Sequence, residues 1–212
     1  MAFLIGISGG SASGKTTFIE KIKETFDETL LTVLSQDHYY KPLHLQVKDE
    51  KGDINYDEPE SIDLEQFYKD VEELENGNEL TIDEYVFNNP NKIPEKIKIK
   101  PSGIIIVEGL FIFGHEPIES KLDLKLFIDA DEEIKFNRRL IRDKEERGMN
   151  EEEIHYQWHN QVVPSYKKHL LPHKENADIL IQNNLNFEDG FVLVIEKIKE
   201  ILNSNNIEIR NF

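Results

Sequence analysis

A glycine-rich segment near the start of the chain has the residue types and spacing of a phosphate-binding loop. Residues 9–16 read GGSASGKT and match the pattern G-x-x-x-x-G-K-[ST]. In this pattern main-chain N–H groups turn toward phosphate oxygens, the lysine reaches the terminal phosphates and the final hydroxyl ligates Mg²⁺. The apolar residues 3–7 predict a strand before the motif, and the residues after Thr16 predict a helix. Because the motif needs this context, we expect the chain to bind a nucleoside triphosphate.

Three carboxylates stand at the ends of apolar runs that predict buried strands: Asp37, Glu108 and Asp129. Ligands of open α/β sheets bind at the carboxyl ends of the strands. A carboxylate placed there can take the proton of a substrate hydroxyl, which suits Asp37 as a general base. Glu108 can hold magnesium directly or through water, or it can be a solvated strand end. For Asp129 we favour a structural role, as a cap of the helix expected to begin near Asp131.

Four of the five arginines fall within ten residues: Arg138, Arg139, Arg142 and Arg147. Helical spacing places Lys135 on the same face as the first three. In phosphoryl transfer, guanidinium groups that close over the γ-phosphate supply much of the charge stabilisation. The cluster therefore predicts an anion site, with pairing to acidic neighbours on the same helix as the alternative.

Histidine and tryptophan give weaker signals. His155 and His159 lie four residues apart, but the intervening residues 156–158 lack the glutamate of a zinc-hydrolase motif. The sequence therefore does not favour a metal site there. Trp158 is expected in the core.

Composition limits the class of protein. The 212 residues suit one domain, and 42 acidic against 25 basic residues give a formal net charge of -17. This field repels nucleic acid and anionic membranes, so neither is an expected partner. No cysteine is present, and no apolar stretch approaches the ~20 residues that cross a bilayer. We expect a soluble cytoplasmic protein.

Five short apolar runs alternate with helical patterns, which predicts a doubly wound α/β sheet. The runs are 3–8, 31–35, 104–108, 124–128 and 178–182. The helical patterns follow Thr16 and cover about 61–76, 131–146, 150–169 and 188–202. Residues 79–101 instead alternate with period two around Asn88-Asn89-Pro90-Asn91, which predicts an inserted β-hairpin.

These motifs together resemble the uridine kinase (uridine-cytidine kinase) family of P-loop kinases. Beyond the phosphate loop, the resemblance rests on LSQDHYYK at 34–41, NYDEPESID at 55–63, IIIVEGLFIF at 104–113, LKLFIDADEEIKFNRRLIRDKEERG at 124–148, and QWHNQVVPSY followed by Pro172 and residues 177–179. The resemblance implies a P-loop NTPase fold with a five-stranded parallel sheet of order 2-3-1-4-5, helices on both faces, an inserted hairpin and a helical lid at about 138–150. It also implies transfer of the γ-phosphoryl of ATP or GTP, with Mg²⁺, to the 5′-hydroxyl of uridine or cytidine in pyrimidine salvage, by a tetramer or dimer.

The resemblance also assigns roles to individual residues. It makes Asp37 the base, has Asp57 hold ribose hydroxyls with Arg139 assisting, and places Arg142 and Arg147 on the triphosphate. The nucleoside pocket would be lined by Tyr40, Tyr85, Phe87, Leu110 and Gln157. The triphosphate ligands would be Gly9, Gly10, Ser11, Ala12, Ser13, Gly14, Lys15, Thr16 and Thr17, with Thr16 and Glu108 on the metal.

Two positions depart from the family pattern. The hairpin histidine that hydrogen-bonds the pyrimidine is Pro90 here, and a second arginine of the lid and nucleoside site is Met149. Pro90 has no side-chain donor, so the base specificity stays open. The alternatives are a related kinase acting on nicotinamide riboside, a pentose phosphate or another polyol, and a nucleotide-binding switch without kinase activity.

Overall fold

A five-stranded parallel sheet forms the centre of the fold. The computed structural model describes residues 2–27, 29–86 and 93–204. The strands are β1 (Phe3–Ser8), β2 (Leu31–Ser35), β5 (Ile104–Gly109), β6 (Leu124–Asp129) and β7 (Ile179–Gln182). Their order is β2-β5-β1-β6-β7, and every pairing is parallel. Numbered along the chain within this sheet, that is the expected order 2-3-1-4-5, which is confirmed.

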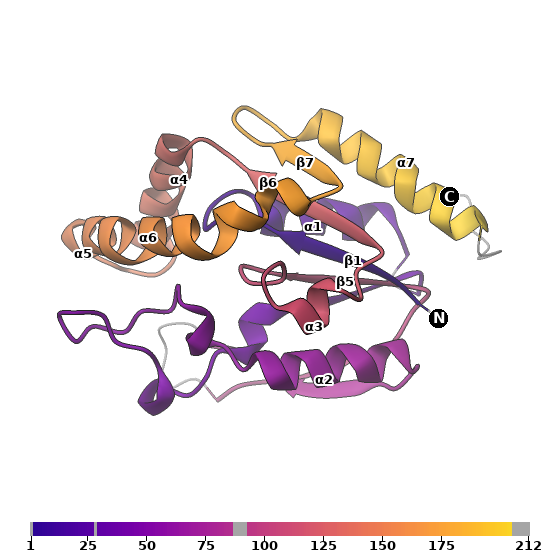
Figure 1. Cartoon of the computed structure of the whole chain (residues 1–212), viewed down its shortest axis with the longest axis horizontal. Helices are drawn as coiled ribbons and strands as arrows, with labels where there is room; N and C mark the ends of the chain where they lie inside the picture. Colours follow the sequence, from indigo (N-terminus) through magenta and orange to yellow (C-terminus); the bar gives the residue numbers. More distant parts are fainter. Residues whose placement is uncertain (1, 28, 87–92, 205–212) are drawn as a thin grey trace.

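Successive side chains of a strand point to opposite sides of the sheet. Because both sets are apolar here, helices cover both faces. In β5, Ile104 and Ile106 belong to one hydrophobic cluster, whereas Ile105 and Val107 belong to the other. The first cluster lies under α1 (Lys15–Thr25) and α7 (Glu188–Ser204), and the second under α2 (Leu64–Glu75) and α3 (Glu116–Glu119). Figure 1 shows these two helical layers with the sheet between them.

Helix α2 forms because its apolar residues recur every three or four positions. Phe67, Val71 and Leu74 are buried on the core side. Asp63 caps the helix, since its carboxylate accepts a hydrogen bond from the N–H of Gln66 at 3.0 Å. The chain then leaves the helix through Gly77, whose φ of 83° is the left-handed conformation that glycine adopts without strain.

A two-stranded antiparallel sheet follows α2. It consists of β3 (Leu80–Asp83) and β4 (Lys96–Ile99). Leu80 and Ile99 pair with each other and are buried in the same cluster as Phe67 of α2. Residues 87–92, which include Phe87 and Pro90, lie outside the described residues.

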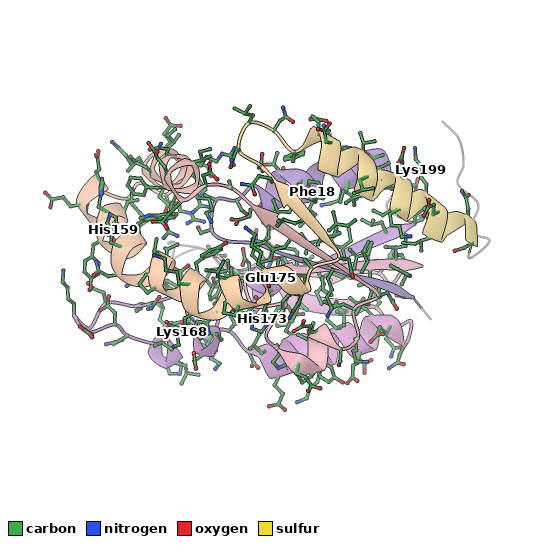
Figure 2. The ribbon with its side chains drawn as sticks, turned by 45° about the horizontal axis from the view of Figure 1, so that its top comes forward. Phe18, His159, Lys168, His173, Glu175 and Lys199 are labelled. Atoms are coloured by element: carbon green, nitrogen blue, oxygen red, sulfur yellow. The ribbon has the colours of Figure 1, made fainter. Side chains whose placement is uncertain are left out.

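The C-terminal half adds a helical layer at one end of the sheet, seen at the left of Figure 1. Helix α4 (Glu132–Glu145) ends before Gly148, whose φ is 65°. A long helical stretch follows, made of α5 (Glu151–Gln157), η4 (Trp158–Val162), α6 (Val163–Ser165), η5 (Tyr166–Leu170) and η6 (Leu171–Asn176). The segments η4 and η5 are widened π turns on either side of Pro164, a residue that has no N–H to donate. Figure 2 shows His159, Lys168 and His173 spaced along this stretch.

Three short 3-10 helices lie in the connections: η1 (Gln36–Tyr39), η2 (Leu43–Leu45) and η3 (Pro59–Ser61). Within residues 2–27, 29–86 and 93–204, no helix combines the length and apolar character needed to cross a bilayer.

Candidate active site

The loop between β1 and α1 has the backbone of an anion cradle. Ala12 has a φ of 59° and Gly14 a φ of 101°, so both adopt the left-handed conformation. Left-handed residues between right-handed ones turn successive main-chain N–H groups toward one point. Helix α1 begins at Lys15, and its positive N-terminal end is directed to the same point. The buried hydroxyl of Ser13 has no hydrogen-bond partner among the described residues. The loop therefore fits phosphate oxygens by geometry and by its unused donors.

Residues distant in sequence hold this loop in place. The side-chain amide of Asn183, at the end of β7, donates to the main-chain oxygen of Ser13 at 2.8 Å. A Cβ on Gly14 would lie 2.2 Å from that amide nitrogen, so only glycine leaves room for it. On the other side, the ring of Tyr166 lies against Gly10, where a Cβ would be 3.0 Å from it. The cradle is thus held by contacts on two sides.

Asp37 is positioned by the strand that precedes it. The hydroxyl of Ser35 at the end of β2 accepts a hydrogen bond from the N–H of Asp37 at 3.2 Å and so caps η1. The buried side chain of Gln36 accepts from the N–H of Phe111 at 3.0 Å, which joins η1 to the segment after β5. Asp37 itself remains exposed. Its carboxylate is therefore fixed at its base and free to meet a ligand.

The phosphate loop and Asp37 line the same cleft, which has a volume of about 1220 Å³. This cleft brings together most of the site residues expected from the sequence. They are Gly10, Ser11, Ala12, Ser13, Gly14, Lys15, Thr16, Thr17, Asp37, Tyr40, Asp57, Tyr85, Leu110, Arg139, Arg142, Arg147 and Gln157. Gly9 and Glu108 are not among the lining residues, and Phe87 lies outside the described part of the chain.

Glu108 is the last residue but one of β5, which ends at Gly109. The hydroxyl of Ser35 donates a hydrogen bond to its carboxylate. Burial raises the pKa of Glu108 above its ordinary value, and the positive charge of Lys15 acts in the opposite direction. Mg²⁺ binds oxygen ligands and takes only one or two from the protein when phosphate supplies others. The Thr16 hydroxyl and the Glu108 carboxylate are oxygen ligands of this kind. Among the described residues, no cluster of three metal-binding side chains occurs.

Aromatic rings form one wall of the cleft. The rings of Tyr40 and Tyr85 lie 5.0 Å apart, and that of Tyr56 lies 5.6 Å from Tyr40. Asp57 follows in the chain, and its N–H donates to the Asn55 side chain at 3.0 Å. Burial raises the pKa of Asp57, and the nearby Arg139 partly offsets that shift. The wall therefore offers flat apolar surface next to a carboxylate.

Arg139 and Arg142 of α4 and Arg147, just beyond its end, converge on one buried carboxylate. Asp143 is 0% exposed. It forms ion pairs with Arg139 at 3.1 Å, with Arg142 at 2.8 Å and with Arg147 at 3.0 Å. Arg139 also donates to the hydroxyl of Ser11 in the phosphate loop at 3.0 Å. The arginine cluster is thus joined directly to the cradle.

Two expectations about charged residues are wrong. Lys135 does not share the site with the arginines, because its ammonium group donates to Asp129 at 2.7 Å and both residues are buried. Asp129 does not cap a helix, since the N-cap of α4 is Asp131. The Asp129 carboxylate instead accepts hydrogen bonds from Lys135, Lys174 and Tyr166. A buried charge without a partner costs free energy, so the Lys135 ammonium group is directed toward the buried Asp129 carboxylate.

Sequence reasoning did not identify three residues that shape the site. Asn183 and His38 each hold main-chain atoms of distant segments, and Tyr56 extends the aromatic wall. Pairing of the arginines with an acidic neighbour, the alternative that the sequence left open, is confirmed at Asp143, which is spaced four residues from both Arg139 and Arg147. The imidazoles of His155 and His159 stack with centroids 6.2 Å apart, while Trp158 is buried as expected.

The comparisons with known proteins agree with this arrangement. Residues 4–187 match the profile described as "Phosphoribulokinase / Uridine kinase family". The chain belongs to this family. The match covers the phosphate loop, Asp37, the aromatic wall and the arginine cluster.

Relatives in this family are similar over most of their length. A protein named uridine kinase from Borrelia duttonii is 41% identical over 181 residues, covering 85% of this chain and 86% of its own. A protein of the same name from Clostridium perfringens is 35% identical over 199 residues, covering 93% and 95%.

Solved structures show the same fold at lower identity. A possible uridine kinase from Bacillus stearothermophilus has a TM-score of 0.59 and 17% identity, and the match covers 84% of this chain and 88% of that one. A phosphoribulokinase from Rhodobacter spheroides has a TM-score of 0.62 and 18% identity, covering 85% and 70%.

Proposed function

We propose that this chain is a nucleoside kinase that transfers the γ-phosphoryl group of ATP or GTP to the 5′-hydroxyl of uridine or cytidine. The observation that carries the proposal is one cleft with an anion cradle on one side and the exposed Asp37 carboxylate on the other. Relatives named uridine kinase, similar over at least 85% of this chain, support the choice of acceptor.

On the donor side, the main-chain N–H groups of residues 9–17 bind the β- and γ-phosphates, and Lys15 adds a positive charge to them. Arg142 and Arg147 approach the γ-phosphate and stabilise the charge that spreads over its oxygens during transfer. Thr16 and Glu108 would hold Mg²⁺, which would neutralise part of the phosphate charge.

On the acceptor side, Asp37 orients the 5′-hydroxyl and accepts its proton as the oxygen attacks phosphorus. Asp57 binds the ribose hydroxyls with help from Arg139. The rings of Tyr40 and Tyr85 stack on the base, and Leu110 and Gln157 complete the pocket with Phe87 of the hairpin. The bond that breaks joins the γ-phosphorus to the β–γ bridging oxygen, so the products are a nucleoside 5′-monophosphate and a nucleoside diphosphate.

We further propose that residues 1–212 form one kinase domain. In it, residues 79–101 are the hairpin that covers the base, and residues 138–150 are a lid that excludes water during transfer. The reaction belongs to pyrimidine salvage in the cytoplasm, and the active form is a tetramer or dimer.

A substrate panel tests the proposal. The purified chain is incubated with ATP, Mg²⁺ and one acceptor at a time, and ADP release is coupled to a colour change. The panel contains uridine, cytidine, nicotinamide riboside and a pentose phosphate, with a reaction lacking acceptor as the control. We expect turnover with uridine or cytidine well above that control. Turnover only with another alcohol would contradict the acceptor, and hydrolysis that is indifferent to acceptors would contradict the kinase.

A further inference from the structure

We propose that Asp143 is a positioning residue that holds Arg139, Arg142 and Arg147 as one unit against the phosphate loop. This inference rests on the proposed function, because it takes the three arginines to act on the triphosphate and the nucleoside. Asp143 itself touches no substrate. It acts through the guanidinium groups that it orients.

The contacts divide the carboxylate among the three arginines. Oδ1 lies 2.8 Å from Nε of Arg142 and 3.0 Å from Nη1 of Arg147. Oδ2 lies 3.1 Å from Nε of Arg139, an ion pair without a hydrogen bond. Arg139 precedes the aspartate by one helical turn and Arg147 follows it by four residues, past the end of α4. One side chain therefore sets the direction of groups on the helix and beyond it.

The charge of the cluster is unbalanced in favour of an anion. Three guanidinium groups surround one carboxylate, which leaves two positive charges over. Burial, assisted by Arg142, lowers the pKa of Arg147 below its ordinary value, as expected for like charges held together. The Asp143 carboxylate therefore does more than form an ion pair. It holds three guanidinium groups that repel one another close enough together to bind one polyanion.

The unit reaches both sides of the cleft. Arg139 donates to Ser11 of the phosphate loop at 3.0 Å and to Gln157 of α5 at 2.9 Å. The charges of Arg139 and Arg142 also act on Asp57, lowering its pKa against the effect of burial. A change in the direction of these guanidinium groups therefore alters the donor site and the acceptor site together.

A double-mutant cycle with Asp143→Asn and Arg142→Gln tests the inference. A displacement of about 1 Å in a positioned group costs on the order of 10²-fold in rate, so Asp143→Asn is expected to lower kcat/KM for the triphosphate by about that factor. Because both residues belong to one unit, the double variant is expected to lie within about 3-fold of the worse single variant. Losses that multiply, to about 10⁴-fold, would overturn the inference.

Triphosphate affinity gives a second readout, measured by calorimetry on the same four proteins without nucleoside. A lost charge-assisted contact weakens binding by about tenfold or more, so Asp143→Asn is expected to bind ATP at least that much more weakly. If the carboxylate acted only through its charge, its removal would make the cluster more positive and tighten binding. Tighter binding would therefore overturn the inference.

Two further variants separate positioning from folding. Glu133→Gln removes the same charge from an exposed position on α4 outside residues 138–150, and we expect it to match the wild type. Asp143→Glu keeps the charge but moves the carboxylate by one methylene. It takes the place of Asp143→Asn in the cycle if that variant does not fold, with the same expected non-additivity. The wild type could fail to turn over uridine or cytidine while ATP binding by the four proteins is still non-additive. In that case the proposed function fails and the role of Asp143 stands.

Discussion

The main-chain N–H of Tyr85 donates a hydrogen bond to Nδ1 of His38 at 3.2 Å. This bond joins the segment after β3 to the 3-10 helix that carries Asp37. It requires an unprotonated Nδ1, because a histidinium has no acceptor. Burial lowers the pKa of His38 below its ordinary value, although the charges of Asp37 and Glu84 act in the opposite direction. The aromatic wall is therefore attached to the catalytic segment by a contact that acid breaks.

We expect the KM for the nucleoside to rise as the pH is lowered from about 7.5 to about 5, mainly below the ordinary histidine pKa of about 6.5, because the pKa of His38 is lowered in the folded chain. The folded-state pKa is lowered, so the stabilisation is fully present above the ordinary value and is lost as the pH falls through the folded value. Initial rates at saturating triphosphate give this KM at each pH. In His38→Asn the amide oxygen accepts at any pH, so an equal rise in KM in that variant would refute the assignment.

Asp37→Asn is expected to abolish most phosphoryl transfer while leaving triphosphate binding intact. The amide cannot accept the hydroxyl proton, and general-base catalysis contributes about 10²- to 10⁴-fold. Because Asp37 is exposed, the variant should fold as the wild type does. Single-turnover rates and ATP titrations measure the two effects separately. Asp189→Asn, an exposed change of the same kind on α7, is the control. Transfer at wild-type rate would remove Asp37 from the mechanism.

Glu108→Gln is expected to raise the Mg²⁺ concentration needed for half-maximal activity. A neutral amide is a poorer ligand for a hard cation than a carboxylate. Since burial raises the pKa of Glu108, the wild type should also need more Mg²⁺ in mild acid, where the carboxyl group begins to take up a proton, and the variant should not. Rates measured across a Mg²⁺ series at two pH values check this. The control is Glu24→Gln on the exposed side of α1. An unchanged Mg²⁺ requirement would exclude Glu108 from the metal site.

Asn183→Ala is expected to weaken the phosphate loop and the fold together. The main-chain oxygen of Ser13 would lose the bond it now receives at 2.8 Å. An unsatisfied buried polar group costs about 1–3 kcal/mol, so the free energy of unfolding should fall by that amount. Urea unfolding and ATP calorimetry measure the two consequences. Asn203→Ala, an exposed change of the same kind on α7, is the comparison, and equal losses in both would show that the contact has no special role.

Residues 138–150 are expected to exchange amide hydrogens more slowly when ATP analogue and nucleoside are both bound. Closure of the arginines on the phosphates would reduce local opening of α4 and of the turn at Gly148. Hydrogen exchange followed by mass spectrometry checks this, with α7 as the internal reference. Equal exchange with and without ligands would mean that this segment is no lid.

The sheet could be predicted from the sequence because its strands are buried on both faces. Residues 104–107 are apolar at every position, as a central parallel strand covered on both faces requires. The phosphate loop could be predicted because its chemistry depends on main-chain conformation that few sequences allow, as at Gly14.

Partners across long sequence distances could not be predicted. Lys135 has the helical spacing of an anion-binding residue, yet the buried Asp129 carboxylate, reached only in the folded chain, determines its direction. Asn183 looks like an ordinary polar residue after a strand, and its amide meets Ser13 only because β7 lies at the edge of this particular sheet. Such contacts depend on tertiary packing and leave no local pattern.

The residues between β2 and β5 lie outside the main sheet and include the aromatic wall and the hairpin. The chain then enters β5, which pairs with both β2 and β1. The sheet order does not depend on the sequence of this connection. Substitutions within it can therefore change which alcohol is recognised while the donor half keeps its geometry. The same fold can therefore recognise different acceptors without any change in the phosphate loop.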